Sequence, residues 1–315
     1  MSSFRAFGSH LPARRVGNAE IAALVGATPE WILEVSGIEE RRYAADADTV
    51  ASLGLAAAQS CLANAGATAV ELGMILAASG SAPRFCPGPA CEIAAGLGFS
   101  STPALDIPVA SCGSLIGLAM AAELAPKFGP VLVIGSEIMS RCIELTPEGK
   151  DAAILFGDGA GAALVDPASG FARIADSILA TDGASAEILR IENGRIAMEG
   201  RSVILQAVRK IPRVLNDLLA RNRLTAAEPC AYLMHQANLN LIARVAQSLK
   251  VPEDRFFVNL ARYGNTSSAS LLIAANEWRA ANAGPLAAPM VLAAFGAGLN
   301  WGALLALPEP AQPVC

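Results

Sequence analysis

The stretch ALDIPVASCGS, residues 104–114, runs from an apolar strand directly into a cysteine followed by a glycine. A helical segment from Ser114 to Ala125 comes next, and we expect Pro126 to end it, because proline is poorly tolerated inside helices. Cys112 is therefore predicted to lie at a strand-to-helix turn. The rest of the chain repeats this alternation of strand and helix.

Apolar runs and helical patterns alternate on both sides of this turn. Short apolar runs predict strands at 74–77, 131–134, 231–234 and 256–260, and a glycine-interrupted strand pair at 152–165. Longer patterns predict helices at 29–37, 49–65, 89–97, 201–221, 239–249 and 267–281. This order is typical of an α/β protein with a mainly parallel sheet.

Two glycine-rich segments suggest that the chain consists of similar halves. FGDGAGAALV at 156–165 and FGAGLNWGALL at 295–305 both suggest strands around a glycine cluster. The alternation restarts after residue 166, so we predict an internal duplication with halves 1–166 and 167–315. Neither cluster has the GxGxxG spacing or opens a helix, which argues against a dinucleotide site.

The composition excludes several classes of protein. Of 315 residues, 53% are hydrophobic and 16% are charged, which indicates elements covered on both faces rather than disorder. A net charge of −5 and 5% aromatic residues provide neither a basic stripe nor a stacking surface for nucleic acid. The seven cysteines form no CxxC pair and no apolar signal segment opens the chain, so we expect a cytoplasmic protein.

One segment, 288–307, is uncharged and long enough to span a bilayer. Pro289, Asn300 and several glycines divide it into two short apolar runs. These runs predict two buried strands around a glycine turn, and we expect no membrane association.

Cys112 is the leading candidate for a nucleophile. A thiol at the start of a buried helix faces the positive end of the helix dipole, which favours the thiolate and lowers its pKa. Gly113 allows a substrate to approach the backbone, and the Cys112 N–H is placed to stabilise an oxyanion. The alternative is a buried structural cysteine, which we expect Cys61, Cys91 and Cys142 to be.

His235 and Asn265 are the polar candidates in the second half. His235 leaves an apolar strand at the end where α/β sheets bind ligands, whereas the other histidine, His10, lies in an expected loop. Asn265 lies between a predicted strand and helix and fits a simple helix cap equally well. Taken singly, neither residue defines a site.

Taken together, the motifs resemble the β-ketoacyl-[acyl-carrier-protein] synthase III family over almost the whole chain. The motifs are TPEWILEVSGIEERR (28–42), DIPVASCGS (106–114), LFGDGAGAALV (155–165), MHQANLNLI (234–242), RYGNTSSAS (262–270) and FGAGLNWGALL (295–305). The resemblance implies a thiolase-like fold, with two duplicated mixed-sheet halves in a five-layered αβαβα sandwich. It also implies that Cys112 carries an acyl group while His235 and Asn265 bind a malonyl thioester that loses carbon dioxide. The N–H groups of Cys112 and Gly298 would form an oxyanion hole for acyl transfer.

The resemblance further implies contacts with coenzyme A or its pantetheine arm. These would come from Trp31, Lys150, Asn238 and Gly200. Trp31 matches a tryptophan that stacks on adenine in the family, but Val35 replaces the arginine that usually completes the stack. Lys150 stands where an arginine usually binds a CoA phosphate.

The positions that dock the carrier protein depart from the family pattern. Asn240 and the pair Gln247-Ser248 replace the usual basic residues. Four other basic residues could form a substitute patch for an acidic carrier, or they could simply be a solvated face. They are Arg209, Lys210, Arg213 and Arg244.

The acyl pocket is expected at Arg84, Phe85 and Cys86. Cys86 stands where the family commonly has a bulky aromatic residue that crosses a dimer interface. If Arg84 faces the tunnel, a carboxylated acyl group becomes a candidate substrate.

We therefore predict an acyltransferase that condenses an acyl-CoA with a malonyl carrier protein or malonyl-CoA, of the kind that initiates fatty-acid synthesis. The alternatives are a specialised homologue for a secondary metabolite or cofactor precursor, simple acyl transfer or hydrolysis, and a catalytically silent partner subunit. The resemblance implies a homodimer that needs no metal and no cofactor beyond the CoA thioester substrate.

Overall fold

A sheet of ten strands, in the order β12-β11-β13-β14-β8-β1-β7-β6-β4-β5, organises the computed structural model, which describes residues 2–310. The first half of the chain supplies β1 (Ser3–His10), β4 (Met74–Ala78), β5 (Ala104–Ile107), β6 (Val131–Ile138) and β7 (Asp158–Asp166). The second half supplies β8 (Ala172–Thr181), β11 (Ala231–Met234), β12 (Phe256–Phe257), β13 (Met290–Gly296) and β14 (Asn300–Pro308).

Both halves have the same strand order and directions, so the predicted duplication of mixed sheets is confirmed. In the first half, β4 is parallel to β5 and β6, while β7 runs antiparallel between β6 and β1. In the second half, β11 is parallel to β12 and β13, while β14 runs antiparallel between β13 and β8. A short pairing of Ser3 and Phe4 with Arg173 and Ala172 joins the two halves.

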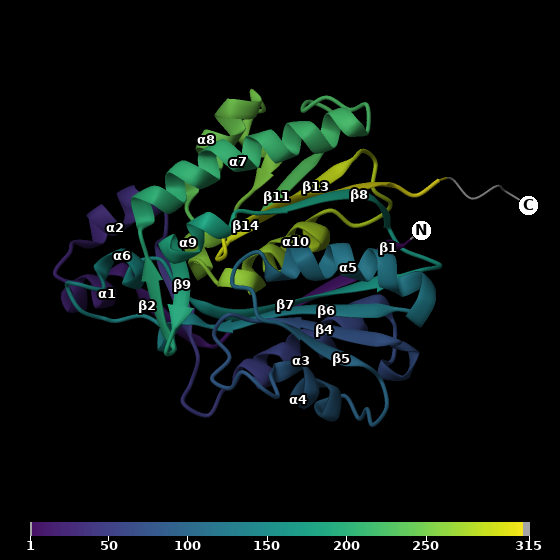
Figure 1. Ribbon diagram of the computed structural model, residues 1–315, viewed down its shortest axis with the longest axis horizontal. Helices are drawn as coiled ribbons and strands as arrows, with labels where there is room; N and C mark the ends of the chain where they lie inside the picture. The colour runs from purple at the N-terminus through teal and green to yellow at the C-terminus, as the bar shows by residue number, and fades with distance from the viewer. Residues whose placement is uncertain (1, 311–315) are drawn as a thin grey trace, which may run out of the picture.

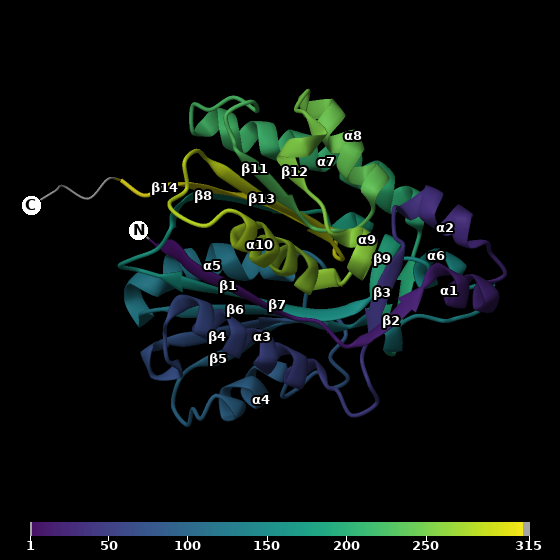
Figure 2. The same cartoon turned by 180° about the vertical axis from the view of Figure 1, so that it is seen from behind.

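Six helices cover the two halves of the sheet. They are α3 (Val50–Ala65), α4 (Pro89–Gly96), α5 (Gly113–Phe128), α7 (Gly200–Arg221), α8 (Leu239–Leu249) and α10 (Ser270–Ala281). Figures 1 and 2 show α3 and α4 outside the first half, α7 and α8 outside the second, and α5 and α10 between the halves. The predicted αβαβα sandwich is thus confirmed.

Smaller elements gather at one end of the sandwich, on the left in Figure 1. They are α1 (Asn18–Val25), α2 (Pro29–Ser36), α6 (Lys150–Ala153), α9 (Leu260–Tyr263), and the two-stranded pairs β2 (Arg14–Gly17) with β3 (Glu40–Tyr43) and β9 (Leu189–Glu192) with β10 (Arg195–Met198). This end also contains the site described below.

Glycines in the sheet allow the central helix α10 to approach closely. A Cβ on Gly161 of β7 would lie 2.5 Å from the Cβ of Leu272 in α10, and one on Gly135 of β6 would lie 2.3 Å from the carbonyl oxygen of Ser268, in the turn that leads into α10. Both distances are far inside van der Waals contact. The GDGAG cluster therefore serves backbone packing, as predicted.

Four local predictions are wrong. His10 is not in a loop but is the last residue of β1, where it pairs with Ala160 of β7. Residues 152–165 are not a strand pair, because α6 ends at Ala153, Gly157 precedes β7, and Gly159 and Gly161 lie within this single strand. Pro126 lies inside α5, which continues to Phe128, since a proline this close to the end costs few helix bonds. Residues 256–260 are a strand only at Phe256–Phe257, and α9 begins at Leu260.

Among residues 2–310, no helix is both long and apolar enough to cross a membrane. The uncharged segment 288–307 contains β13 and most of β14, which are central, buried strands of the second half. The prediction of two strands around a glycine turn is confirmed.

Candidate functional site

Cys112 lies at a tight turn between β5 and α5. Ser111 has a φ of 64°, which is rare for residues other than glycine, and the Cys112 N–H donates to the Ala110 carbonyl at 2.7 Å. Such a backbone costs about 1–3 kcal/mol and persists only where its surroundings hold it. Here Ser267 holds it, because its Oγ accepts the Ser111 N–H at 3.0 Å.

A buried carboxylate, Glu137 of β6, fixes Ser267 in turn. Its Oε1 accepts the Ser267 hydroxyl at 2.9 Å and the Ser268 N–H at 3.2 Å. Further donors come from residues 79–81, namely the Ser79 hydroxyl, the Gly80 N–H and both the N–H and hydroxyl of Ser81. Glu137 is fully buried and ties loops of both halves together beside the Cys112 turn.

Cys112 itself is completely buried, and burial raises the pKa of its thiol to about 12. The Sγ atom lies 3.9 Å from the Ala294 carbonyl oxygen, to which the thiol donates. Our expectation of a lowered pKa is therefore wrong, because removing a thiolate from water is costly and no cationic group offsets that cost. The resting residue is a thiol at neutral pH.

The other cysteines follow the prediction only in part. Cys61 and Cys142 are buried, as expected for structural cysteines, whereas Cys91 is exposed on the solvent side of α4. The expectation for Cys91 is wrong because α4 is an outer helix that buries one face only. Cys315 lies outside the described residues.

His235 leaves β11 beside β13, where its N–H donates to the Ala293 carbonyl at 2.8 Å. Its Nδ1 lies 2.5 Å from the hydroxyl of Ser270, the first residue of α10. The side chain is almost fully buried, and burial lowers the pKa of the imidazole to about 4. The ring is therefore neutral at pH 7, with one nitrogen protonated and one free to accept.

Asn265 is held through both its backbone and its side chain. Its N–H donates to the Leu155 carbonyl at 2.8 Å, and its carbonyl accepts the Gly157 N–H at 3.0 Å. The side-chain Oδ1 accepts the Ser267 N–H at 2.9 Å. Because Oδ1 is anchored in this way, the Nδ2 group is left to donate to a ligand.

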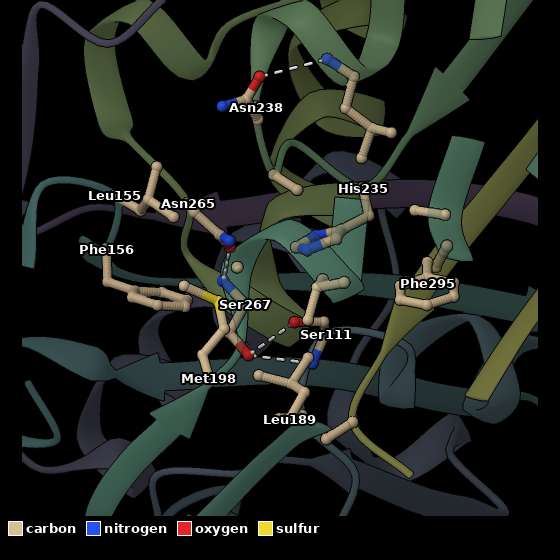
Figure 3. A pocket seen from close by; sticks show the side chains of 18 of the residues that line it. Ser111, Leu155, Phe156, Leu189, Met198, His235, Asn238, Asn265, Ser267 and Phe295 are labelled. Carbon is tan, nitrogen blue, oxygen red and sulfur yellow. Dashed lines mark hydrogen bonds between the residues drawn. The ribbon is translucent and has the colours of Figure 1, made fainter. Parts of the chain in front are cut away.

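A cavity of about 890 Å³, counting its open mouth, joins these residues. His235, Asn265 and Ser111 line it, and Figure 3 shows the His235 ring and the Asn265 amide facing one another across this space. Its other walls are mainly apolar and include Leu155, Phe156, Leu189, Met198, Ile204 and Phe295. Cys112, which follows Ser111 in the chain, is fully buried and does not itself line the cavity.

The two predicted oxyanion donors, the N–H groups of Cys112 and Gly298, have different surroundings. The Cys112 N–H is already bonded to Ala110, so this bond must be shared or exchanged when an oxyanion forms. Gly298 lies in the turn between β13 and β14, next to the cavity-lining Ala297, and its φ of 125° favours glycine. Gly296 packs against the Cys112 turn, where a Cβ would lie 2.3 Å from the Ala110 oxygen.

The predicted CoA-binding residues divide into two groups. Gly200, at the start of α7, and Asn238 line the cavity, while Trp31 and Lys150 do not. Asn238 also caps α8, since its Oδ1 accepts the Leu241 N–H at 3.2 Å. Trp31 and Lys150 lie together, with the Lys150 Nζ 5.0 Å from the centre of the Trp31 ring, so the ammonium group lies over the ring.

The predicted acyl-pocket residues surround a second cavity. Arg84 and Phe85 line it, and it shares the walls Ala110 and Ala297 with the first cavity. Cys86 is exposed and does not line it. Arg84 is not a free cation, because it donates to the Pro87 carbonyl at 3.0 Å and pairs with Glu92.

Sequence reasoning missed the residues that position the site. No motif in the sequence marks these residues as functional. They are Ser111, Glu137, Ser267 and Ser270. The available signals were a carboxylate inside the apolar run VLVIGSEI at 131–138 and the serine-rich run after Asn265. Among residues 2–310, no group of three or more His, Cys, Asp and Glu side chains is arranged to hold a metal ion.

Two family models match the chain. The model described as 3-oxoacyl-[acyl-carrier-protein (ACP)] synthase III matches residues 105–192, and the model of its C-terminal part matches residues 219–307. β-Ketoacyl-[acyl-carrier-protein] synthase III of Oleidesulfovibrio alaskensis is 40% identical over 95% of this chain and 96% of the relative. The protein of the same name from Pasteurella multocida is 36% identical over 95% and 96%.

Solved structures agree with these similarities. The crystal structure of 3-oxoacyl-[acyl-carrier-protein] synthase III from Aquifex aeolicus superposes with a TM-score of 0.93, at 31% identity, and covers 98% of this chain and 100% of its own. The priming β-ketosynthase of a polyketide pathway gives a TM-score of 0.90 at 29% identity, with 98% and 97% coverage. OleA of Xanthomonas campestris, at 17% identity and a TM-score of 0.88, shares the fold.

Proposed function

Since the chain belongs to the β-ketoacyl-[acyl-carrier-protein] synthase III family, we propose that Cys112 carries the acyl group and that His235 and Asn265 activate the malonyl thioester. The chain is a condensing acyltransferase of the type that initiates fatty-acid synthesis. One observation supports the residue roles above all: Ser267 contacts both the Cys112 turn and the Asn265 amide, beside the cavity that His235 lines.

In the first half-reaction, Cys112 Sγ attacks the carbonyl carbon of an acyl-CoA. The Sγ–C bond forms, the C–S bond to CoA breaks, and the thiol proton ends on the departing CoA sulfur. Because burial raises the pKa of the Cys112 thiol, the proton leaves as the attack proceeds rather than before it. The N–H groups of Cys112 and Gly298 are the proposed oxyanion donors.

In the second half-reaction, the malonyl thioester loses carbon dioxide and becomes an enolate. The enolate oxygen accepts bonds from the His235 ring N–H and the Asn265 Nδ2–H. The enolate carbon then attacks the acyl carbonyl, so that a C–C bond forms, the C–Sγ bond breaks and the Cys112 thiolate takes up one proton from solvent. Fixed donors in an apolar cavity suit this step, and losing one typically costs about 10²–10³ in rate. The balance needs no metal and no redox cofactor.

The CoA or pantetheine arm is proposed to lie along the apolar cavity past Gly200 and Asn238. Trp31 and Lys150 would meet the nucleotide end. This assignment rests on the position of the first pair in the cavity wall and on the contact within the second pair. A Trp31→Ala change should raise the KM for acyl-CoA and leave the KM for the malonyl carrier unchanged.

For the carrier protein, we propose a docking patch of Arg209, Arg213 and Arg244. Arg209 and Arg213 are exposed one turn apart on α7, the helix whose start lines the cavity, and Arg244 is exposed on the adjacent α8. Lys210 is not part of this patch, because its Nζ bonds Asp182 at 2.8 Å and covers the Trp301 ring. Reversing the charge of Arg209 should raise the KM for the malonyl carrier protein and leave the KM for malonyl-CoA unchanged.

A homodimer in the cytoplasm is also proposed. Strand β5 lies at the edge of the sheet, its Leu105 side chain is half exposed, and Phe85, which lines the same cavity as Asp106 and Ile107 of β5, is 85% exposed. An uncovered edge and exposed apolar groups favour pairing with a second copy. Sedimentation at several protein concentrations would test this.

A specialised condensing role is the second candidate. It is favoured by the similarity to the priming β-ketosynthase of a polyketide pathway and by the departures at Val35, Asn240 and Cys86. The ion pair of Arg84 with Glu92 argues against a carboxylated acyl group, because the arginine already has a carboxylate partner.

Intact-mass measurement separates these functions. The protein is mixed with a panel of acyl-CoA thioesters and then with malonyl carrier or malonyl-CoA. We expect an acyl adduct that Cys112→Ala abolishes, that Cys142→Ala retains, and that malonyl thioester discharges as a 3-oxoacyl product. An adduct that persists would indicate acyl transfer or hydrolysis, and no adduct at all would refute the assignment of Cys112.

A further inference from the structure

The hydroxyl of Ser270 is the one contact described at the inner nitrogen of His235. Ser270 Oγ lies 2.5 Å from Nδ1 and is 2% exposed as a residue, so water does not compete for either group. Ser270 opens α10 and thus belongs to the rigid central layer rather than to a loop. The contact joins residues 35 positions apart.

The direction of this hydrogen bond follows from the other partner of Ser270. A serine hydroxyl has one hydrogen to donate and two lone pairs to accept with. One lone pair already accepts the Gln236 N–H at 3.1 Å. If Nδ1 also donated to Oγ, the buried hydroxyl hydrogen would have no acceptor among the described residues, at a cost of about 1–3 kcal/mol. The hydroxyl therefore donates to Nδ1.

Gln236 keeps this arrangement fixed. Its Nε2 donates to the Met234 carbonyl at 2.8 Å and to the Phe257 carbonyl at 3.1 Å, and its Oε1 accepts the Asn259 N–H at 3.0 Å. With the side chain locked, the Gln236 backbone N–H cannot turn away from Ser270. The lone pair that it occupies is thus permanently taken.

We infer that Ser270 is a positioning residue that sets the tautomer of His235, so that Nδ1 accepts from Ser270 and Nε2 carries the proton toward the cavity. The inference rests on the proposed function in one respect, since the Nε2–H is the donor assigned to the enolate. Without the Ser270 hydroxyl, the proton could reside on either nitrogen, and an unprotonated Nε2 would repel the enolate oxygen instead of stabilising it.

Selective ¹⁵N labelling of histidine tests the inference without any activity measurement. The chain has two histidines, so a His10→Gln variant leaves only the His235 signals. At pH 7 we expect a pyrrole-type Nε2 and a pyridine-type Nδ1 in the resting protein. Ser270→Ala should shift both resonances toward a mixture of tautomers, and Ser270→Thr, which keeps a hydroxyl, should restore them.

Kinetics then distinguish positioning from general damage. Ser270→Ala should slow condensation by roughly tenfold to a hundredfold and leave Cys112 acylation within about threefold of wild type. Ser2→Ala is the matched control, because it removes a buried hydroxyl bonded to the Ala122 carbonyl at 2.7 Å. A wild-type Nδ1–H tautomer would overturn the inference, as would unchanged resonances and condensation in Ser270→Ala. Failure of the proposed function would show instead as a wild-type protein that forms no adduct.

Discussion

Glu137→Gln is the sharpest test of how the site is held together. The carboxylate is fully buried and accepts bonds from six donor groups, namely three hydroxyls and three backbone N–H groups. Glutamine has the same shape, but its amide nitrogen cannot accept. The NH₂ side of the glutamine amide, which is itself a donor, must therefore face hydrogen-bond donors of the protein.

The loss of unfolding free energy can be estimated for the amide orientation that disturbs fewer donors. If the amide nitrogen takes the place of Oε1, it faces the Ser267 hydroxyl and the Ser268 N–H, which now bond that oxygen at 2.9 and 3.2 Å. The Gly80 N–H, shared between both oxygens, keeps its bond to Oε2. Rotation of the hydroxyl can relieve the first contact, but the buried Ser268 N–H loses its acceptor. One unsatisfied buried donor and one lost charge-assisted bond cost together about 3–5 kcal/mol. The melting temperature should fall by roughly 10 °C.

Function should fall with stability, because Ser267 no longer has a fixed partner while it holds the Ser111 turn. Urea unfolding would give the stability change, and intact mass would give the rate of Cys112 acylation. Glu71→Gln is the control, since this carboxylate is 40% exposed and ion pairs at the surface, such as its pair with Arg5, contribute little to stability. A Glu137→Gln protein within 1 kcal/mol of wild type, acylating at the wild-type rate, would refute the reasoning.

Three further outcomes follow from burial and packing. Because burial raises the pKa of Cys112 to about 12, its alkylation by iodoacetamide should rise about tenfold per pH unit up to pH 9 and lag behind that of exposed Cys86, as peptide mass mapping can show. Burial lowers the pKa of His235 from 6.5 to about 4, so its contribution to stability is present above pH 6.5 and lost as the pH falls toward 4. In urea titrations from pH 7 to 4, wild type should therefore lose about 3 kcal/mol more than His235→Gln. Gly161→Ala would place a Cβ 2.5 Å from a side-chain atom of α10 and should lower the unfolding free energy by more than about 2 kcal/mol, whereas Gly183→Ala, with no atom within 4 Å of its Cβ, should change it little.

The sequence predicted those parts of the site that depend on local pattern. Cys112 and His235 each follow a short apolar strand, and the position of such residues at strand ends can be read from a few neighbours. The contacts that fix them cannot be read in this way. Ser111 meets Ser267 across 156 positions, and Ser267 meets Glu137 across 130. Nothing near any of these residues in the chain indicates its partner.

The same limit explains the wrong pKa of Cys112 and the unexpected pairing of Arg84. A helix start can be recognised in a sequence, and so can its favourable dipole. Whether the thiol is also sealed from water depends on β13, which lies about 180 residues further along and supplies the Ala294 carbonyl. Likewise, the hypothesis that Arg84 faces the acyl tunnel did not foresee its ion pair with Glu92 of α4.

The duplicated topology explains why the site forms at the junction of the halves. Cys112 precedes the central helix α5, and Asn265 precedes its counterpart α10, so the same turn of the fold provides both residues. Both turns contain a serine with a left-handed backbone, Ser111 at φ 64° and Ser267 at φ 49°. These two serines bond each other, so each strained turn is stabilised by the other half. The geometry of the Cys112 turn therefore depends on the assembly of both halves, and neither half alone contains Cys112, His235 and Asn265 together.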